Sequence, residues 1–134
     1  MKETLVDSSV LIDVLTRDET WFEWSSSILK VTADESSVVI NPVIYSEVST
    51  KFRRMEELDE VLPLALCRRD NIPYPVAFLA ARAFVKCRPQ GGSRISPLSE
   101  FYIGAHAEVA KFRVLTRDPR RIRRYFPTVE LITP

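Results

Sequence analysis

The chain has few of the residues that form zinc sites, disulfide bonds and flexible linkers, and it has no long apolar run. Its 134 residues include two cysteines, one histidine and three glycines. Cys67 and Cys87 are isolated from each other, which excludes a Cys-x-x-Cys zinc or redox site and a disulfide framework. No apolar run approaches the roughly 18 residues that a membrane-spanning helix needs. With 46% apolar and 28% charged residues, the sequence instead predicts one globular domain over residues 1–134.

The sequence also lacks a secretory signal peptide and a phosphate-binding P-loop. Residues 1–4 lack the apolar segment and cleavage site of a secretory signal peptide, so we expect a cytoplasmic protein with no membrane partner. The pair Gly91–Gly92 lacks the lysine pattern of a phosphate-binding P-loop, which disfavours hydrolysis of nucleoside triphosphates.

The formal net charge of +1 conceals two unlike halves. Residues 1–60 carry 13 acids and 6 bases, whereas residues 61–134 carry 5 acids and 13 bases. Six arginines crowd residues 113–124 beside a single acid, Asp118. Guanidinium groups bind phosphate in a bidentate manner, so this cluster favours a nucleic-acid backbone over a membrane surface. A solvated face or a site for an acidic protein partner remains an alternative.

Short apolar segments alternate with amphipathic ones along the chain, a pattern typical of an α/β fold with a parallel sheet covered on both faces. Asn41 and Pro42 form a helix start, with Asn as the N-cap and Pro in the first turn. In such sheets ligands bind beyond the carboxyl ends of the strands. The pattern predicts strands at 4–6, 37–40, 114–116 and 129–132, and a loop at 89–93. It predicts a first helix that is capped by Ser8 or Ser9 and runs to residue 15, and further helices at 21–31, 42–51, 53–69, 75–87 and 98–112.

Four acids fall where this crevice is expected. Asp7 and Asp118 follow strands, and Glu47 lies in the second turn of a helix that follows a strand. Glu100 opens the helix at 98–112, which is apolar around most of its circumference and is therefore expected in the interior. Each has an alternative structural role: a helix cap for Asp7, a turn for Asp118, an ion pair for Glu47 and a helix-dipole contact for Glu100. Together they would repel one another unless a cation neutralised them.

A hard divalent cation is the simplest neutralising partner. Mg²⁺ and Mn²⁺ prefer oxygen ligands, and one histidine with two scattered cysteines cannot form a zinc site of the nitrogen and sulfur type. A carboxylate-held metal beside an arginine-rich surface suits hydrolysis of phosphodiester bonds.

Four motifs, at residues 6–13, 41–47, 101–107 and 115–119, resemble those of the PIN-domain ribonucleases, specifically the VapC-type toxins. The resemblance covers nearly the whole chain. It implies a Rossmann-like α/β PIN domain whose central parallel sheet of four to five strands is flanked by helices. It also implies a Mg²⁺- or Mn²⁺-dependent endoribonuclease, a hydrolase that cuts RNA such as tRNA as the toxin of a type II toxin–antitoxin pair. The expected partners are an RNA substrate, a VapB-type antitoxin that blocks the site and a second copy in a homodimer.

The resemblance also assigns site residues. By motif matching, Asp7, Glu47, Glu100 and Asp118 occupy the catalytic acidic positions, with Asp7, Glu100 and Asp118 as metal ligands. Ser9 and Thr116 match small polar positions that support the metal or its waters. Asp13 and His106 lie in matching motifs, where we expect supporting or packing roles. The basic residues expected to contact RNA phosphates, or to pair with the acids, are Arg94, Arg117, Arg120 and Arg121.

Two positions depart from the family pattern: Glu100 stands where relatives usually carry Asp, and Ser9 where Asn is frequent. The longer Glu100 side chain leaves two functions open. The chain is either an active nuclease or a catalytically weakened PIN-fold protein that binds RNA or antitoxin. A third, weaker alternative is a phosphoacceptor domain that uses Asp7, because such domains also place an acid at a strand end.

Overall fold

The computed structural model describes residues 2–63, 66–91 and 98–134. Strands and helices alternate through most of the chain, as the pattern of apolar segments predicts. The elements are β1 (Thr4–Val6), α1 (Ser8–Leu15), α2 (Phe22–Glu35), β2 (Val38–Ile40), α3 (Pro42–Ser49), α4 (Met55–Val61), β3 (Arg68–Arg69), α5 (Tyr74–Gly91), α6 (Leu98–Ala110), β4 (Arg113–Leu115), α7 (Arg120–Tyr125) and β5 (Leu131–Ile132).

The five strands form one sheet in the order β3-β2-β1-β4-β5, and each neighbouring pair is parallel. The first strand is therefore central, with Leu5 beside Val39 on one side and beside Val114 on the other. This arrangement confirms the expected α/β fold with a parallel sheet of four to five strands. It also brings the ends of β1 and β4 together, although more than a hundred residues separate them in sequence.

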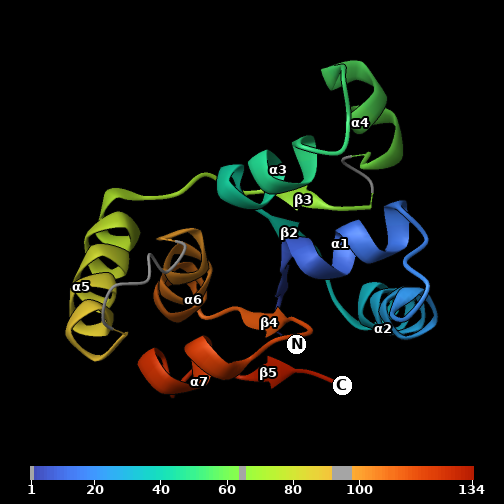
Figure 1. The fold of residues 1–134 in the computed structure, drawn as a ribbon. Helices are drawn as coiled ribbons and strands as arrows, with labels where there is room; N and C mark the ends of the chain where they lie inside the picture. The colour runs from blue at the N-terminus through green and yellow to red at the C-terminus, as the bar shows by residue number, and fades with distance from the viewer. Residues whose placement is uncertain (1, 64–65, 92–97) are drawn as a thin grey trace.

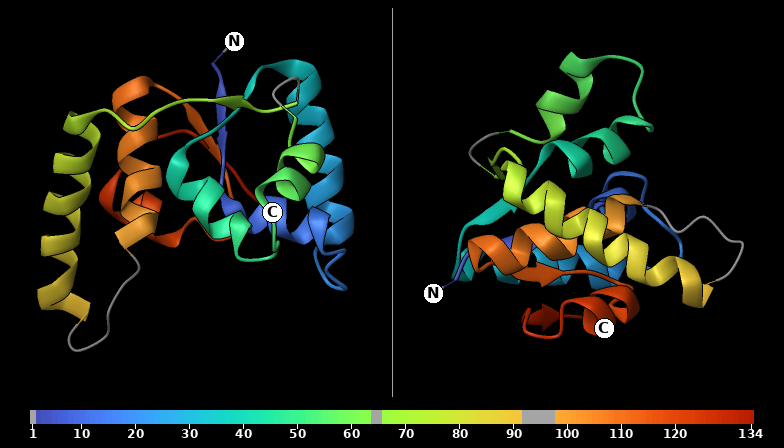
Figure 2. Two further views of the ribbon diagram at one scale, coloured as in Figure 1. Left: turned by 90° about the horizontal axis from the view of Figure 1, so that it is seen from above. Right: turned by 90° about the vertical axis from the view of Figure 1, so that its left-hand side faces the viewer.

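Helices cover both sides of the sheet. In two views α1 and α2 lie on one side, and α5 and α6 lie on the other (Figures 1 and 2). Strands buried on both faces need apolar side chains throughout, and Leu5, Val6 and Val39 are all fully buried. Helix α6 is the interior helix that its apolar circumference predicts, with six consecutive or near-consecutive buried positions between residues 101 and 107.

The structure corrects three local predictions. Residues 53–69 do not form one helix: α4 ends at Val61, Pro63 follows, and Arg68–Arg69 form the edge strand β3. This strand was missed because both of its side chains are exposed and charged. Helix α7 was also missed, since Ile122 is its one buried residue among arginines. Finally, α5 continues to Gly91 through the first part of the expected loop; the rest of that loop lies outside the described residues.

Two close contacts fix helices that border the candidate site. At Gly104 in α6, a methyl group in place of the hydrogen would overlap the ring of Phe126, which follows α7, and would lie only 2.6 Å from its Cε2 atom. Only glycine therefore allows this approach of α6 to the end of α7. At the start of α3, the Asn41 side chain accepts a hydrogen bond from the backbone N–H of Ile44 at 2.9 Å, which confirms the expected N-cap.

No helix within the described residues has the length and hydropathy to cross a bilayer.

Candidate functional site

All four predicted acids line one cavity of about 410 Å³ at the carboxyl ends of β1 and β4. The backbone builds this meeting point directly, because the N–H of Asp7 donates to the carbonyl of Leu115 at 2.9 Å. Glu47 enters from α3 and Glu100 from the first turn of α6. The cavity also contains the hydroxyl-bearing residues Ser8, Ser9 and Thr116, the arginines Arg117 and Arg121, and three isoleucines.

Asp7 is held by two hydroxyl groups. Ser9 Oγ and Thr116 Oγ1 both donate to Oδ2 of Asp7, at 2.9 and 2.8 Å. The side chain does not cap α1, so the alternative role considered for it does not apply. Its other oxygen, Oδ1, accepts no hydrogen bond from the described residues and is available to a ligand in the cavity. The two residues expected to support the site therefore orient Asp7.

Glu47 has a similar pair of donors. Ser8 Oγ donates to Oε1 at 2.9 Å, and Ser99 Oγ donates to Oε2 at 3.0 Å. No arginine pairs with Glu47 among the described residues, which removes its alternative role. Sequence reasoning missed both serines. Ser8 was visible as part of the first motif, and Ser99 precedes Glu100, but neither spacing indicated that they converge on Glu47.

Glu100 and Asp118 have arginine partners from α7 or its start. Arg121 Nη1 contacts Oε2 of Glu100 at 2.5 Å. Arg120 forms two hydrogen bonds to Asp118, at 2.9 and 2.8 Å. The bonds from Arg120 hold the pKa of Asp118 below its usual value. The hydrogen bond to Glu100 likewise raises the pKa of Arg121. The four acids thus divide into two oriented by hydroxyls and two neutralised by cations.

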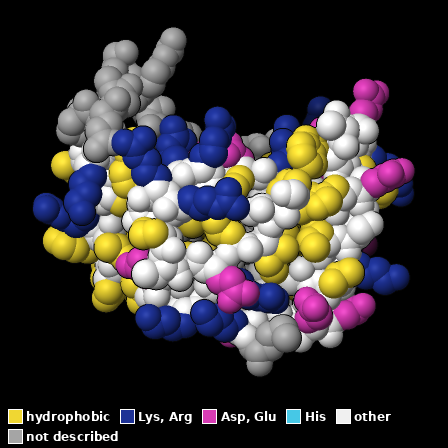
Figure 3. Space-filling view, turned by 90° about the horizontal axis from the view of Figure 1, so that it is seen from below, with side chains coloured by type: hydrophobic (Ala, Val, Ile, Leu, Met, Phe, Trp, Pro, Cys, Tyr) yellow, Lys and Arg dark blue, Asp and Glu magenta, His cyan; other side chains and the backbone are white. Residues whose placement is uncertain are grey.

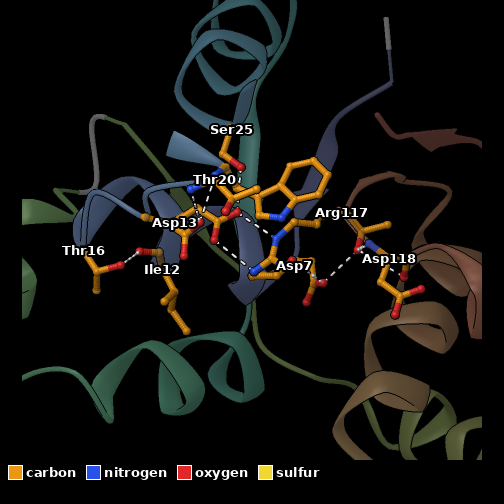
Figure 4. Close-up of polar contacts among 12 residues, drawn as sticks. Asp7, Ile12, Asp13, Thr16, Thr20, Ser25, Arg117 and Asp118 are labelled. Carbon is orange, nitrogen blue, oxygen red and sulfur yellow. Dashed lines mark hydrogen bonds and ion pairs between the residues drawn. The ribbon is translucent and has the colours of Figure 1, made fainter. Parts of the chain in front are cut away.

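Arg117 lies beside Asp118 in sequence but turns away from it toward Asp13 (Figure 4). Its guanidinium donates two hydrogen bonds to Asp13, both of 2.9 Å, and Ser25 Oγ donates a third at 2.8 Å. The guanidinium also lies 5.3 Å from the centre of the Trp21 ring. Because Asp13 is 1% exposed, this pair is buried on the acid's side. It ties the segment that carries Thr116 and Asp118 to α1 and α2.

His106 lies away from the cavity, at 1% exposure. Asn41 uses its oxygen to cap α3, so its Nδ2 donates to His106 Nδ1 at 3.0 Å. The neutral ring then carries its proton on Nε2, which lies 3.3 Å from Asp70 in poor hydrogen-bond geometry. Burial lowers the pKa of His106, and Asp70 offsets part of that effect. Arg94, another predicted residue, lies outside the described residues.

The donors in the cavity suit a hard divalent cation. They are carboxylate and hydroxyl oxygens, with no histidine or cysteine among the described lining residues. In the described part of the chain, however, no three acidic, histidine or cysteine side chains form a ready-made metal cluster. The reason lies in the ion pairs, because Glu100 and Asp118 face arginines. Asp7, Glu100 and Asp118 could hold a metal only after these two acids exchange partners.

Comparisons with known proteins agree with the observed architecture. No curated protein matches the sequence. The chain is similar to a structure of VapBC2 from Rickettsia felis bound to a promoter DNA fragment, with 13% identity over 98% of both chains and a TM-score of 0.71. It is also similar to VapBC-1 from nontypeable Haemophilus influenzae, with 11% identity, coverage of 98% and 97%, and a TM-score of 0.72. A toxin–antitoxin complex from Klebsiella pneumoniae matches with 19% identity, coverage of 98% and 97%, and a TM-score of 0.64.

These solved structures share the fold with our chain. The sequence itself matches the PIN domain family over residues 4–126, a span that contains all four cavity acids and the two hydroxyl residues that orient Asp7, Ser9 and Thr116. The match confirms the family resemblance seen in the four motifs. The chain therefore belongs to the PIN domain family.

Proposed function

We propose that this protein is a Mg²⁺- or Mn²⁺-dependent endoribonuclease. The observation that carries the proposal is the convergence of Asp7, Glu47, Glu100 and Asp118 on one cavity in a PIN domain. Residues 1–134 would then act as a single catalytic domain. When bound, the metal would supply an activated water and neutralise charge on the phosphate.

The present contacts of the cavity residues suggest which of them would bind the metal, accept a proton or bind the RNA phosphate. Asp7, with Oδ2 fixed by Ser9 and Thr116, presents Oδ1 as a preoriented ligand. Glu47, oriented by Ser8 and Ser99, would accept a proton from a water in the cavity. Glu100 and Asp118 would be the other two residues to hold the metal, in place of their present ion pairs with Arg121 and Arg120. Freed from Glu100, Arg121 could bind the RNA phosphate, since it lines the same cavity.

We further propose that the protein is the toxin of a type II toxin–antitoxin pair. The structural likeness to VapBC assemblies and to a toxin–antitoxin complex supports this role. The partner would be a VapB-type antitoxin, and the chain would form a cytoplasmic homodimer. Co-expression with the neighbouring small open reading frame should yield a complex and relieve growth arrest. If it did neither, the toxin role would be abandoned while the nuclease proposal could stand.

The decisive experiment compares two single-charge variants. The purified protein should cut RNA, including tRNA, only when Mg²⁺ or Mn²⁺ is present. Asp7→Asn should abolish cleavage because it removes the charge of the preoriented ligand. Asp34→Asn removes an exposed acid from α2 and should cut at the wild-type rate. Full cleavage by Asp7→Asn would refute the nuclease assignment.

A second function is favoured by one observation: the third and fourth acids are already neutralised by Arg121 and Arg120. In that case the chain would be a weakened PIN-fold protein that binds RNA or antitoxin without turnover. Glu100→Asp tests the difference, because the shorter side chain reaches Arg121 less readily and restores the usual family residue. Efficient cleavage by the wild type, with no gain in Glu100→Asp, would remove this alternative.

A further inference from the structure

Of the four arginines expected to bind RNA, the three that the structure describes have intramolecular partners. Arg117 is bound to Asp13, Arg120 to Asp118 and Arg121 to Glu100. Each cation therefore has its charge locally neutralised by a carboxylate. Arg121, once released from Glu100, would serve only the phosphate inside the cavity, so the RNA strand beyond it needs other basic groups to hold its backbone. Among the described residues, Arg82 and Lys86 of α5 are exposed and form no ion pair, and they lie near the end of α7.

A second hollow, of about 470 Å³, lies between α5 and α7. We call it the α5–α7 groove and define it by its lining residues. Three of these residues are basic, and none is acidic. The floor is apolar and includes two buried side chains, Ala83 at 6% and Phe126 at 2% exposure. The lining residues are Leu79, Arg82, Ala83, Lys86, Arg124, Tyr125 and Phe126.

The basic side chains of the groove come from two helices. Arg82 and Lys86 are one turn apart on α5, so they project from the same face, and both are exposed. Arg124 lies in the last turn of α7, with its guanidinium 5.6 Å from the centre of the Tyr125 ring. Lys and Arg side chains also gather over much of the surface that carries α7 (Figure 3). The groove is thus a concave surface with positive charge on both walls.

Helix α7 connects this groove to the acid cavity. Its residues Arg121 and Ile122 line the cavity, and Arg124 and Tyr125 line the groove. A helix of six residues is only about 9 Å long. A single strand with one phosphate in the cavity would therefore reach the groove within a few nucleotides.

We propose that the α5–α7 groove binds the sugar–phosphate backbone of the RNA strand next to the bond that is cut. This assignment rests on the proposed nuclease function and adds a binding surface to it. Arg82, Lys86 and Arg124 would contact phosphates, so binding here is independent of sequence. The continuity with the acid cavity favours RNA over an acidic protein as the occupant.

The test uses the double variant Arg82→Ala/Lys86→Ala and a labelled single-stranded oligoribonucleotide in EDTA. Without metal the RNA stays intact, so binding is measured separately from cleavage. Each lost phosphate contact makes the negative slope of log K against log salt shallower by about 0.7 for single strands. Two lost contacts should make the slope shallower by about 1.4 and weaken binding about 25-fold at 0.1 M salt.

The control is Lys30→Ala/Arg53→Ala, which removes the same charge from exposed positions on α2 and beside α4. It should bind RNA like the wild type. In Mg²⁺, the groove variant should show a raised KM for long RNA, with kcat unchanged. A dinucleotide, whose single phosphodiester bond occupies the acid cavity, should be cut equally by the wild type and the groove variant.

The outcomes separate the two proposals. If the wild type cuts RNA but the groove variant keeps wild-type affinity and salt slope, the groove assignment is wrong and the nuclease stands. If the groove variant loses affinity for the antitoxin but not for RNA, the groove is a protein-binding surface and the assignment is again wrong. If the wild type neither binds nor cuts RNA, the proposed function fails, and the groove assignment fails with it.

Discussion

The buried pair of Asp13 and Arg117 allows a quantitative prediction, because its two members differ in access to water. Asp13 is 1% exposed and accepts three hydrogen bonds, two from Arg117 and one from Ser25. The Arg117 side chain is 33% exposed and also contacts the Trp21 ring. Removing either member therefore leaves the other in a very different environment.

Arg117→Ala should cost more than Asp13→Ala. The first change leaves a buried carboxylate with only Ser25 as a donor, and breaking a buried pair in this way costs about 3–5 kcal/mol. We expect a loss of about 4 kcal/mol in the free energy of unfolding. After Asp13→Ala, Arg117 can turn to water and keep its contact with Trp21, so the loss should be about 2 kcal/mol. The double variant should lose about 3 kcal/mol, less than the sum of the single losses.

Urea unfolding of the four proteins, followed by circular dichroism, measures these values. Asp34→Ala, which removes an exposed acid from α2, is the control and should change stability by less than about 0.5 kcal/mol. Both single variants should also weaken Mn²⁺ binding, because Arg117 ties down the segment that holds Thr116 and Asp118. Equal losses in the two single variants, or strictly additive losses in the double variant, would refute the argument from unequal burial.

Three other outcomes follow from contacts within the core. Gly104→Ala should destabilise the protein by about 2 kcal/mol, because overpacking costs about 1–3 kcal/mol and the new methyl group would overlap the Phe126 ring. Adding Phe126→Leu to this variant should recover part of the lost stability, as measured by thermal unfolding. The His106 pKa lies below its usual value of 6.5 because of burial. Protonation therefore favours the unfolded chain, so the free energy of unfolding should be constant above pH 6.5 and fall below it. NMR titration of this single histidine, together with unfolding at each pH, measures the pKa and the stability. A pKa above 6.5 would contradict the effect of burial on His106. Burial raises the pKa of Cys67 to about 11, so at pH 8 iodoacetamide should label it only in denaturant, as mass spectrometry would detect; rapid labelling of the native chain would show that this thiol is accessible.

The positions of the four acids could be predicted because they depend on backbone topology. Parallel strands end at the same edge of a sheet, so acids that follow β1 and β4 must lie close together. Glu47 was equally accessible to prediction, since Asn41 and Pro42 fix where its helix begins. These inferences need only the type and order of the elements.

The partners of the acids could not be predicted in the same way. Arg120 and Arg121 act from α7, a six-residue helix whose arginine-rich sequence has little apolar periodicity. The choice of Asp13 by Arg117, rather than the adjacent Asp118, depends on the rotamer and on the buried setting beside Ser25 and Trp21. Such pairings arise from tertiary packing, so they cannot be predicted from the spacing of residues in the sequence.

The central place of β1 has a consequence for the integrity of the chain. A fragment that stops before β4 still holds Asp7 and Glu47, yet it lacks the Thr116 hydroxyl and Asp118. Proteolysis before β4, or synthesis interrupted there, would thus destroy the site although Asp7 and Glu47 remain. A ribosome making this protein would complete no acid cavity until β4 and the residues just after it had been added.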